Sequence, residues 1–490
     1  MAAETKVEYT KLFINNEWCD SASGKTFPTI NPANNQEICQ LQEADKVDVD
    51  LAVKAARDAF EFGSEWRSMA AAQRSALMGK LVELVQRDSD KLARLITLDM
   101  GKTLKAAQFE AMFSAATLAY YAGWPDKVTG KTLQPGASED AFFAYTRHEP
   151  IGVCGAIIPW NYPLAMIAWK IGPALACGCT MVMKAAEQSP LVGLHMAALI
   201  KEAGFPPGVF NLVNGYGPTA GAAISEHMDI DKVAFTGSVE TGRLVMQAAA
   251  KSNLKKVSLE LGGKSPLIIF PDVDLDEAVK TAHGAIFTNN GQVCSAGSRV
   301  FVHEDIYDKF VAKAVETAVK SNVTNPMEED ADNGSMVDEQ QYNVVLDLIV
   351  KGVDEGAALK CGGKKIEREG FYIQPTVFAD VTDEMTIAKQ EIFGPVQSIL
   401  KFKDIDEVIA RANATAYGLG SGVLTKDIDK AMKVVNGIEA GTVWVNCYNY
   451  THPQCPFGGF KQSGHGRELG KYALKEYTEV KQVTMKLYNQ

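Results

Sequence analysis

The chain has 490 residues, 46% hydrophobic and 22% charged, which is too long for one hydrophobic core and typical of two or three folded domains. A formal net charge of −11 would repel a phosphate backbone, which argues against nucleic acid as a partner. Nine cysteines without a Cys-x-x-Cys pair are typical of free thiols in a reducing compartment rather than of a disulfide scaffold.

Residues 150–270 alternate short apolar runs with helix-like stretches. Residues 150–169 carry no charge over roughly the length of a membrane-spanning helix. Pro159 and Pro163 interrupt this stretch, so a buried strand, a turn and a buried helix are the better interpretation. Strands are expected over 153–158, 180–184, 209–213, 232–235, 257–261 and 267–270. Helices are expected over 190–203, with Ser189 as its N-cap, and over 239–250. This alternation predicts a doubly wound, largely parallel sheet.

A second block of the same character follows residue 270. Strands over 299–303 and 442–446, and helices over 305–321, 338–355 and 405–412, predict a second α/β domain. Residues 131–149 and 477–488 alternate like strands but fit neither block. Such strands leave unpaired edges, which proteins often cover with another subunit, so these two segments indicate an oligomer.

Several glycine-rich segments could hold a phosphate. Gly-Lys-Thr at 101–103 and 130–132 resembles the end of a Walker motif, but the glycine required five residues earlier is Ile96 or Pro125, so both are chance matches. Residues 215–221 resemble a dinucleotide fingerprint with one residue too many, and an ordinary turn before a helix explains them equally well. Residues 235–242 follow a strand and open a helix, so their free N–H groups favour an anion and support dinucleotide binding.

Two residues stand out as candidates for covalent chemistry. Cys294 lies in a polar, glycine-bearing segment between a predicted helix and strand, where a loop could expose its thiol to a cleft. Glu260 closes an apolar run, so its carboxylate is either paired with a cation or has a raised pKa suited to a base. From local sequence alone, the structural and catalytic interpretations of these residues are about equally favoured. No residues have the spacing of zinc ligands, so no metal is predicted.

Seven motifs, taken together, resemble the aldehyde dehydrogenase superfamily in order and spacing. They lie at 159–161 (Pro-Trp-Asn), 184–187 (Lys-Ala-Ala-Glu), 235–238 (Phe-Thr-Gly-Ser), 259–263 (Leu-Glu-Leu-Gly-Gly), 291–294 (Gly-Gln-Val-Cys), 391–395 (Glu-Ile-Phe-Gly-Pro) and 456–459 (Pro-Phe-Gly-Gly). Finer features at 147–152, 444–447 and 459–464 are similar to the class 1 branch, which holds cytosolic aldehyde and retinal dehydrogenases. The N-terminal residues contain neither an apolar signal core nor an Arg-rich presequence, which agrees with a cytoplasmic location.

The resemblance implies a fold and a catalytic mechanism. It implies a Rossmann-like NAD-binding domain (1–127 and 151–262), a catalytic α/β domain (263–476) and a small β element for oligomerisation (128–150 and 477–490). Cys294 would attack the aldehyde and form a thioester, Asn161 and the Cys294 N–H would hold the oxyanion, and Glu260 would activate the hydrolytic water. Lys184 would contact the cofactor and support this network.

The implied cofactor is NAD. An acid matching Glu187 binds the adenosine ribose in this family, and a carboxylate there would repel the 2′-phosphate of NADP. Gly237 and Ser238 would meet the pyrophosphate, and Glu391 with Phe393 the nicotinamide end. The full set of expected cofactor contacts is Ile158, Pro159, Trp160, Lys184, Glu187, Gly217, Pro218, Gly237, Ser238, Gly242, Leu261, Gln341, Glu391 and Phe393.

The substrate pocket is expected to be aromatic. Its predicted lining is Phe113, Tyr162, Trp169, Thr451 and Phe457, although these aromatics could equally be core. Phe113 stands where retinal-oxidising relatives have glycine, which would narrow the channel against a bulky polyene. The resemblance also implies a homotetramer acting on a small-molecule aldehyde, with neither membrane nor nucleic acid as a partner. The alternative is a crystallin-like structural protein of the same branch, and recruitment of that kind can retain the catalytic residues.

Overall fold

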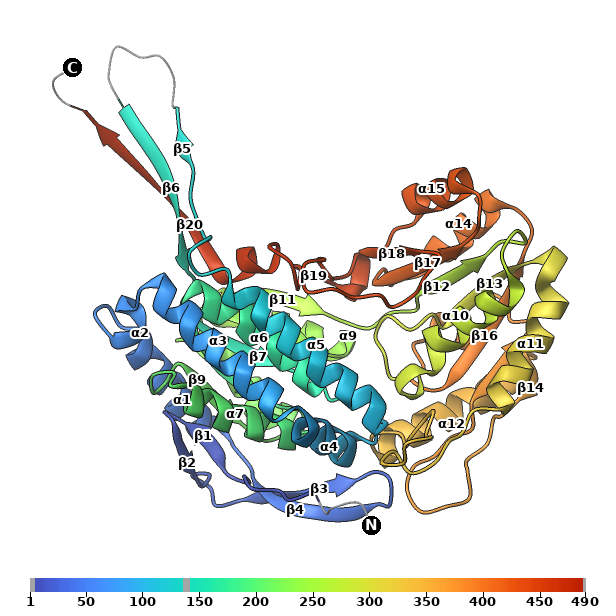
Figure 1. Ribbon diagram of the computed structural model, residues 1–490, viewed down its shortest axis with the longest axis horizontal. Coiled ribbons are helices and arrows are strands. Elements are labelled where there is room, and N and C mark those ends of the chain that lie inside the picture. Colours follow the sequence, from blue (N-terminus) through green and yellow to red (C-terminus); the bar gives the residue numbers. More distant parts are fainter. Residues whose placement is uncertain (1–4, 135–141, 488–490) are drawn as a thin grey trace.

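The computed structural model describes residues 5–134 and 142–487, which form two α/β units side by side and a strand arm that projects from the first unit (Figure 1). The first unit is built on an eight-stranded sheet of order β19-β11-β10-β7-β8-β9-β1-β2. Its strands are β1 (Leu12–Ile14), β2 (Glu17–Cys19), β7 (Val153–Ile157), β8 (Thr180–Lys184), β9 (Phe210–Val213), β10 (Lys232–Thr236), β11 (Lys256–Glu260) and β19 (Gly464–His465). The five central strands are parallel; β1 and β19 pair antiparallel with them, and β2 pairs antiparallel with β1.

Helices cover both faces of this sheet, as the strand–helix alternation predicted. One apolar cluster packs α3 (Ala71–Arg87), α4 (Ser89–Met100), α5 (Leu104–Ala122), α6 (Pro163–Cys177) and α7 (Leu191–Ala203) on one face. A second cluster packs α1 (Lys46–Phe60), α8 (Ala222–Glu226) and α9 (Val239–Lys251) on the other. Short α2 (Glu65–Ser68) follows α1, and β3 (Thr26–Asn31) pairs with β4 (Gln36–Gln42) in a separate hairpin.

The second unit has a seven-stranded sheet of order β14-β15-β16-β13-β12-β17-β18, parallel except for β14. Its strands are β12 (Pro266–Ile269), β13 (Arg299–His303), β14 (Ala358–Cys361), β15 (Thr376–Ala379), β16 (Val396–Phe402), β17 (Gly420–Leu424) and β18 (Thr442–Val445). Its helices are α10 (Leu275–Phe287), α11 (Tyr307–Val319), α12 (Glu339–Asp354), α13 (Thr386–Lys389), α14 (Ile405–Asn413) and α15 (Ile428–Gly437). The apolar residues form one cluster on each face, so this unit is doubly wound as well.

The uncharged segment before Lys170 folds as the sequence predicts, into buried strand β7, a turn and buried helix α6. Pro163 occupies the first position of α6, where a missing N–H costs nothing, and Gly178 ends the helix with a left-handed φ of 89°. In the part of the chain that the structure describes, no helix has the length and apolar character needed to span a bilayer.

The predicted N-cap of α7 is wrong. Helix α7 begins at Leu191, and the Leu191 N–H donates to the Asp99 Oδ2 carboxylate oxygen at 2.7 Å, whereas the buried Ser189 hydroxyl has no partner among the described residues. Asp99 lies near the end of α4, almost a hundred residues earlier. A serine beside the helix is the usual capping residue, but tertiary packing here supplies a stronger acceptor from elsewhere.

The two strand-like segments outside the α/β blocks pair with each other. Strand β6 (Phe142–Pro150) pairs antiparallel with β20 (Thr478–Lys486) along its whole length, and β5 (Thr132–Leu133) extends the ribbon on the other edge of β6. The ends of the predicted oligomerisation element, at 135–141 and 488–490, and the first four residues of the chain lie outside the described residues. This three-stranded sheet is the projecting arm in Figure 1.

Candidate active site

The predicted nucleophile and base meet where the two sheets join. Glu260 is the last residue of β11, and Cys294 lies between the one-turn helix η2 (Thr288–Gly291) and β13. The Cys294 Sγ donates to the Glu260 Oε1 at 3.5 Å. Gly263 permits this approach, because a Cβ on that residue would lie 2.6 Å from the Cys294 carbonyl oxygen. The first sheet therefore supplies the carboxylate, and the second supplies the thiol.

The turn before Cys294 has an unusual backbone. Asn289, Asn290 and Gly291 are left-handed in succession, with φ of 53°, 55° and 71°. Gly291 admits no side chain, because a Cβ there would lie 2.0 Å from the Gly394 oxygen. The Asn290 side chain donates to the Ser335 carbonyl at 2.8 Å, which ties the turn to the chain before α12. Left-handed non-glycine residues carry a conformational cost, which the surrounding contacts here offset.

Asn161 contacts this same turn from the other unit. Its side-chain Nδ2 donates to the Gln292 carbonyl at 3.0 Å, and its own carbonyl accepts from the Asn289 Nδ2 at 3.2 Å. Gln292 lies two residues before Cys294. The predicted oxyanion donor is thus held by direct hydrogen bonds to the loop that carries the thiol.

Burial sets the electrostatics of the pair. Burial, with the nearby Glu468 charge, raises the pKa of Glu260 to about 7, and its Oε2 has no hydrogen-bond partner within the described ranges. Burial, together with the Glu260 and Glu391 charges, raises the pKa of Cys294 well above that of an ordinary thiol. Near neutral pH the thiol is therefore protonated, and the adjacent carboxylate is about half ionised and able to accept a proton.

The residues expected to bind the adenosine end lie at the carboxyl ends of the parallel strands. Lys184 ends β8, and its Nζ donates to the Glu187 Oε2 and to the Ala185 carbonyl, each at 3.0 Å. Burial lowers the pKa of Lys184, and the Glu187 charge opposes that shift. The Glu187 side chain remains 32% exposed, so its carboxylate is open to a ligand. Gly217 and Pro218 begin an exposed π-helical turn (Gly217–Gly221) where the sequence indicated only a long turn.

The expected pyrophosphate site is the N-terminus of α9. Ser238 caps this helix, its Oγ accepting from the Thr241 N–H at 3.2 Å. Gly237 and Gly242 are required for close packing: a Cβ would lie 2.5 Å from the Phe235 ring at Gly237 and 2.8 Å from Leu261 at Gly242. A capped helix end with glycines beside it has the partial positive charge and open backbone that suit an anion.

The residues expected at the nicotinamide end also gather near Cys294. The Glu391 Oε1 accepts from the Gly263 N–H at 3.0 Å, and burial raises the pKa of Glu391 to about 7. The Phe393 ring meets the Trp160 ring edge to face, with centroids 5.3 Å apart. Gln341 donates to the Ile392 and Phe393 carbonyls, so it holds the backbone of this segment.

The remaining expected cofactor contacts lie on the segment between β7 and α6. Ile158 is buried and its N–H donates to the Lys184 carbonyl at 3.2 Å, whereas Pro159 is half exposed. These residues therefore connect the Lys184 end of the site to Trp160 and Asn161.

Three of the five predicted pocket residues form an aromatic group. The Trp169 ring lies edge to face with the Phe113 ring at 6.5 Å and with the Phe457 ring at 5.5 Å between centroids. The Tyr162 ring lies beneath the Lys102 ammonium, and the Thr451 hydroxyl donates to the Asn449 carbonyl at 3.5 Å. The structure thus brings Phe113, Trp169 and Phe457 together, whereas Tyr162 and Thr451 have other polar neighbours.

Comparison with known proteins places this arrangement in a family. Residues 18–483 match the aldehyde dehydrogenase family. The chain belongs to the aldehyde dehydrogenase family. It is 59% identical to aldehyde dehydrogenase 1A1 of Oryctolagus cuniculus, covering 98% of this chain and 97% of that protein, and 58% identical to aldehyde dehydrogenase 1A1 of Homo sapiens, covering 99% and 97%. These relatives confirm the resemblance to the class 1 branch.

Solved structures agree with this assignment. The NAD⁺ complex of an aldehyde dehydrogenase from Bacillus cereus superposes with a TM-score of 0.96 at 50% identity, covering 98% of this chain and 97% of that one. Betaine aldehyde dehydrogenase from Staphylococcus aureus, also in complex with NAD⁺, gives 0.95 at 38% identity, covering 98% and 96%. The expected fold class and the expected class of enzyme are confirmed.

The sequence interpretation missed one ion pair of this dehydrogenase, that between Lys170 and Glu468. The Lys170 Nζ donates to the Thr236 Oγ1 at 2.7 Å and forms a very short ion pair with Glu468. Thr236 is the register partner of Glu260, so the pair lies directly behind the base, and its charges act on the pKa of Glu260 in opposite directions. A lysine in a fully buried helix was the available signal, but its partner lies 298 residues away in sequence.

Proposed function

We propose that this protein oxidises an aldehyde to its carboxylic acid through a thioester on Cys294, with Glu260 as the base and Asn161 as an oxyanion donor. The observation that carries this proposal is the 3.5 Å contact between the Cys294 thiol and the Glu260 carboxylate. Asn161 donates to Gln292 on the loop that carries this thiol. A buried carboxylate with a pKa of about 7 is suited to proton transfer at neutral pH.

The steps follow from these positions. Glu260 takes the Cys294 proton, and the thiolate adds to the aldehyde carbonyl carbon. The Asn161 amide and the Cys294 N–H stabilise the oxyanion, an interaction that typically lowers a barrier by about 3–4 kcal/mol per donor. NAD, when bound, accepts the hydride that this carbon loses, which leaves a thioester. Glu260 gives up to solvent the proton that it took from Cys294, and then takes a proton from the attacking water. The C–S bond breaks, the acid is released, and Glu260 returns its proton to the Cys294 thiolate. Lys184 would support this arrangement through its contact with Glu187.

NAD is the cofactor that these residues fit. The capped N-terminus of α9 suits a pyrophosphate, and the open Glu187 carboxylate suits a pair of ribose hydroxyls. Both structural relatives described above are NAD⁺ complexes. Gly217, Pro218, Gly242, Leu261 and Gln341 would complete the site as the sequence predicts.

Replacing Glu187 with glutamine should weaken the preference for NAD over NADP. The amide keeps the size of the side chain but removes the negative charge that repels a 2′-phosphate, so KM for NADP should fall and KM for NAD should rise. Steady-state kinetics with both cofactors measure the ratio of the two kcat/KM values. Glu202→Gln, an exposed charge removal on α7 away from the site, is the matched control. An unchanged ratio in Glu187→Gln would contradict the assignment of this carboxylate.

The substrate is proposed to be a small aliphatic or aromatic aldehyde. Phe113 is half buried and lies against Trp169, which in turn packs on Phe457, so the aromatic group narrows the space beside helix α5. A bulky polyene would require that space to be open. Tyr162 and Thr451 are proposed to line the remainder of the pocket.

A kinetic survey from acetaldehyde to retinal, with NAD, tests the function and the substrate class together. The wild-type enzyme should prefer the small aldehydes, and Phe113→Gly should raise kcat/KM for retinal while changing that for acetaldehyde little. Phe109→Gly, an exposed position on the same helix, controls for helix destabilisation by glycine. Absence of NADH formation with every aldehyde would favour the crystallin-like structural alternative, and equal use of retinal and acetaldehyde by the wild type would reject the narrow pocket.

The projecting arm is proposed to assemble a homotetramer. The ribbon exposes apolar side chains, including Phe142, Phe143 and Val480, which a second subunit would cover. The division into the cofactor, catalytic and oligomerisation domains given above remains a prediction. Residues 464–465, assigned to the catalytic domain, pair with β11 in the first sheet. A cytoplasmic location is proposed, since one similar protein, from Macroscelides proboscideus, carries the name aldehyde dehydrogenase, cytosolic 1.

A further inference from the structure

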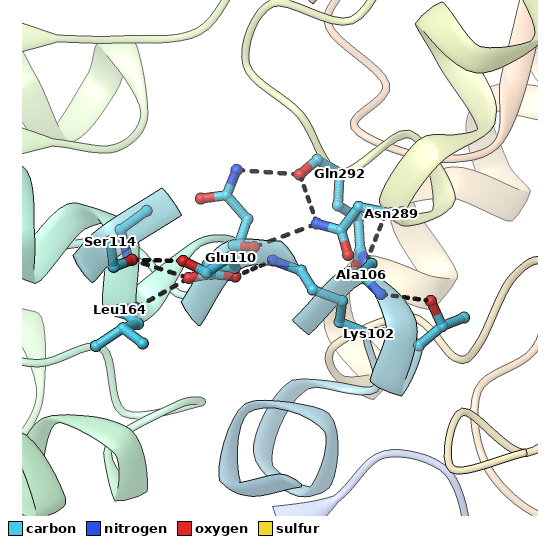
Figure 2. Close-up of polar contacts among 10 residues, drawn as sticks. Lys102, Ala106, Glu110, Ser114, Leu164, Asn289 and Gln292 are labelled. Carbon is cyan, nitrogen blue, oxygen red and sulfur yellow. Dashed lines mark hydrogen bonds and ion pairs between the residues drawn. The ribbon is translucent and has the colours of Figure 1, made fainter. Parts of the chain in front are cut away.

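An ion pair outside the proposed catalytic set is buried beside the turn that carries Asn161. Lys102 precedes helix α5, and Glu110 lies two turns into that helix. Their side chains are 0% and 1% exposed, and the Lys102 Nζ forms a short ion pair with the Glu110 Oε2. Figure 2 shows the Lys102 ammonium facing the Glu110 carboxylate, with Leu164 on the other side of that carboxylate. Lys102 is the lysine of the Gly-Lys-Thr segment that resembles a Walker motif by chance.

The other Glu110 oxygen caps the helix that follows Asn161. The Glu110 Oε1 accepts from the Leu164 N–H at 3.0 Å and from the Ala165 N–H at 3.1 Å, both in the first turn of α6 (Figure 2). These N–H groups carry the partial positive charge of the helix end, and they have no partner within a helix. One carboxylate therefore accepts hydrogen bonds from the N-terminus of α6 and pairs with the Lys102 ammonium.

Lys102 reaches the same turn by a second route. Its Nζ lies 3.6 Å from the centroid of the Tyr162 ring, which belongs to the residue directly after Asn161. An ammonium over an aromatic face is attracted more strongly where water is excluded. Residue 162 and residues 164–165 are thus held by the two members of one ion pair, while Asn161 itself donates to Gln292.

The Lys102 turn is also linked to the Cys294 loop, through Ser335. The Gly101 carbonyl accepts from the Ser335 N–H at 3.2 Å, and the Ser335 carbonyl accepts from the Asn290 side chain at 2.8 Å. Gly101 has a φ of 77°, and a Cβ there would lie 2.1 Å from the Ser335 Oγ, so this approach requires glycine. The segment that carries the ion pair is therefore linked to the turn after Asn161 and, through Ser335, to the loop that carries Cys294.

We infer that Lys102 and Glu110 are positioning residues, which fix the Asn161 amide relative to the Cys294 loop. A buried ion pair contributes little net stability, because the cost of desolvating both charges offsets their attraction. A neutral pair of similar shape would therefore fill this space as stably. The charges instead fix the orientation of the turn after Asn161. Lys102 attracts the Tyr162 ring, and Glu110 accepts from the Leu164 and Ala165 N–H groups.

The inference rests on the proposed role of Asn161 as an oxyanion donor. A double-mutant cycle distinguishes failure of that role from failure of the positioning role. The doubly neutral variant Lys102→Met/Glu110→Gln removes both charges without leaving one unpaired, so the chain should fold with a Tm close to that of the wild type. Its kcat/KM for an aldehyde should fall on the order of 10- to 100-fold, as expected for a misplaced catalytic group. KM for NAD should not change, because the hydrogen bonds and ion pair of Lys102 and Glu110 in the described structure involve none of the expected cofactor contacts.

The decisive measurement is made in an Asn161→Ala background. If the pair acts through the Asn161 side chain, adding Lys102→Met/Glu110→Gln to Asn161→Ala should cause no further loss of kcat/KM. Losses that multiply, or a doubly neutral variant with wild-type kcat/KM, would overturn the inference while leaving the proposed function intact. A normal kcat/KM for Asn161→Ala alone would instead reject the oxyanion role on which the inference rests.

Trp66→Phe is the matched control. The Trp66 indole N–H donates to the Gly178 and Cys179 carbonyls at 3.1 Å, at the opposite end of helix α6. This change also removes a buried polar contact to the terminus of that helix. It should lower Tm more than it lowers kcat/KM, and its small effect on kcat/KM should be the same in the Asn161→Ala background. A non-additive effect for Trp66→Phe as well would show general destabilisation and overturn the positioning role.

Discussion

Replacing Cys294 with alanine is expected to abolish aldehyde oxidation, lowering kcat on the order of 10⁴-fold or more. The thiol is the nucleophile of the proposed mechanism, and among the described residues it is the cysteine that donates to Glu260. The Cys294 Sγ is also the donor to Glu260, so its loss removes the proton that the carboxylate takes in the first step. NADH formation measures turnover, and fluorescence titration with NAD checks that the cofactor still binds.

Cys361→Ala is the matched control for this experiment. Cys361 is half buried like Cys294, but it lies on the edge strand β14 of the second sheet, where its Sγ donates to the Pro375 carbonyl. Its removal should leave kcat unchanged. Normal turnover by Cys294→Ala would show that the covalent mechanism is wrong, whatever the behaviour of the control.

Glu260→Gln is expected to slow release of the acid on the order of 10²- to 10⁴-fold. The amide can take neither the Cys294 proton nor the proton of the hydrolytic water. Because water is a far weaker acid than a thiol, hydrolysis should slow more than thioester formation, and the thioester should accumulate. Rapid mixing with NAD and aldehyde should show a burst of NADH approaching one per active site, followed by slow steady turnover. Asp99→Asn removes another buried carboxylate, whose pKa burial raises to about 8, and should keep normal turnover. A fast steady state without a burst in Glu260→Gln would reject Glu260 as the base.

The raised pKa of Glu260 predicts that activity and stability change in opposite directions with pH. Activity should rise with pH through about 7, as Glu260 ionises. The folded-state pKa is raised from an ordinary value of 4.5, so the stability that Glu260 contributes is present below pH 4.5 and is lost as pH rises through 7. Glu260→Gln should therefore be more stable than the wild type at pH 8, by on the order of 3 kcal/mol. Thermal unfolding of both proteins at pH 5 and pH 8 measures this difference, which should shrink at the lower pH.

The sequence predicts the buried strands best. The predicted strands at 180–184 and 299–303 match β8 and β13, because the three middle residues of each strand are apolar, as expected of a central parallel strand. The helices at 307–319 and 339–354 begin and end within two residues of their predicted bounds. The cap of α7 could not be predicted in this way, because Asp99 reaches Leu191 only after α4 has packed on α7.

The candidate site was predictable as a set of residues but not as a set of contacts. Motif order indicated Cys294, Glu260 and Asn161, yet local sequence could not show that they meet, since they lie on different units. The ion pairs behind them gave still weaker signals. Glu110 lies on the buried face of α5 between Ala107 and Ala111, but only the fold shows that its carboxylate points to the N-terminus of α6.

The origin of the thiol and the carboxylate in different sheets has a mechanical consequence. Neither unit contains a complete proton-transfer pair, so each would be chemically inert by itself, however well it folded. A rotation of one unit against the other would change the 3.5 Å separation while leaving both sheets intact, because it would disturb only packing between the units, such as that of Leu419 and Trp444 on the first core. Catalysis therefore requires the two units to keep their relative orientation. Activity should be lost at a lower temperature or denaturant concentration than the one that unfolds the sheets.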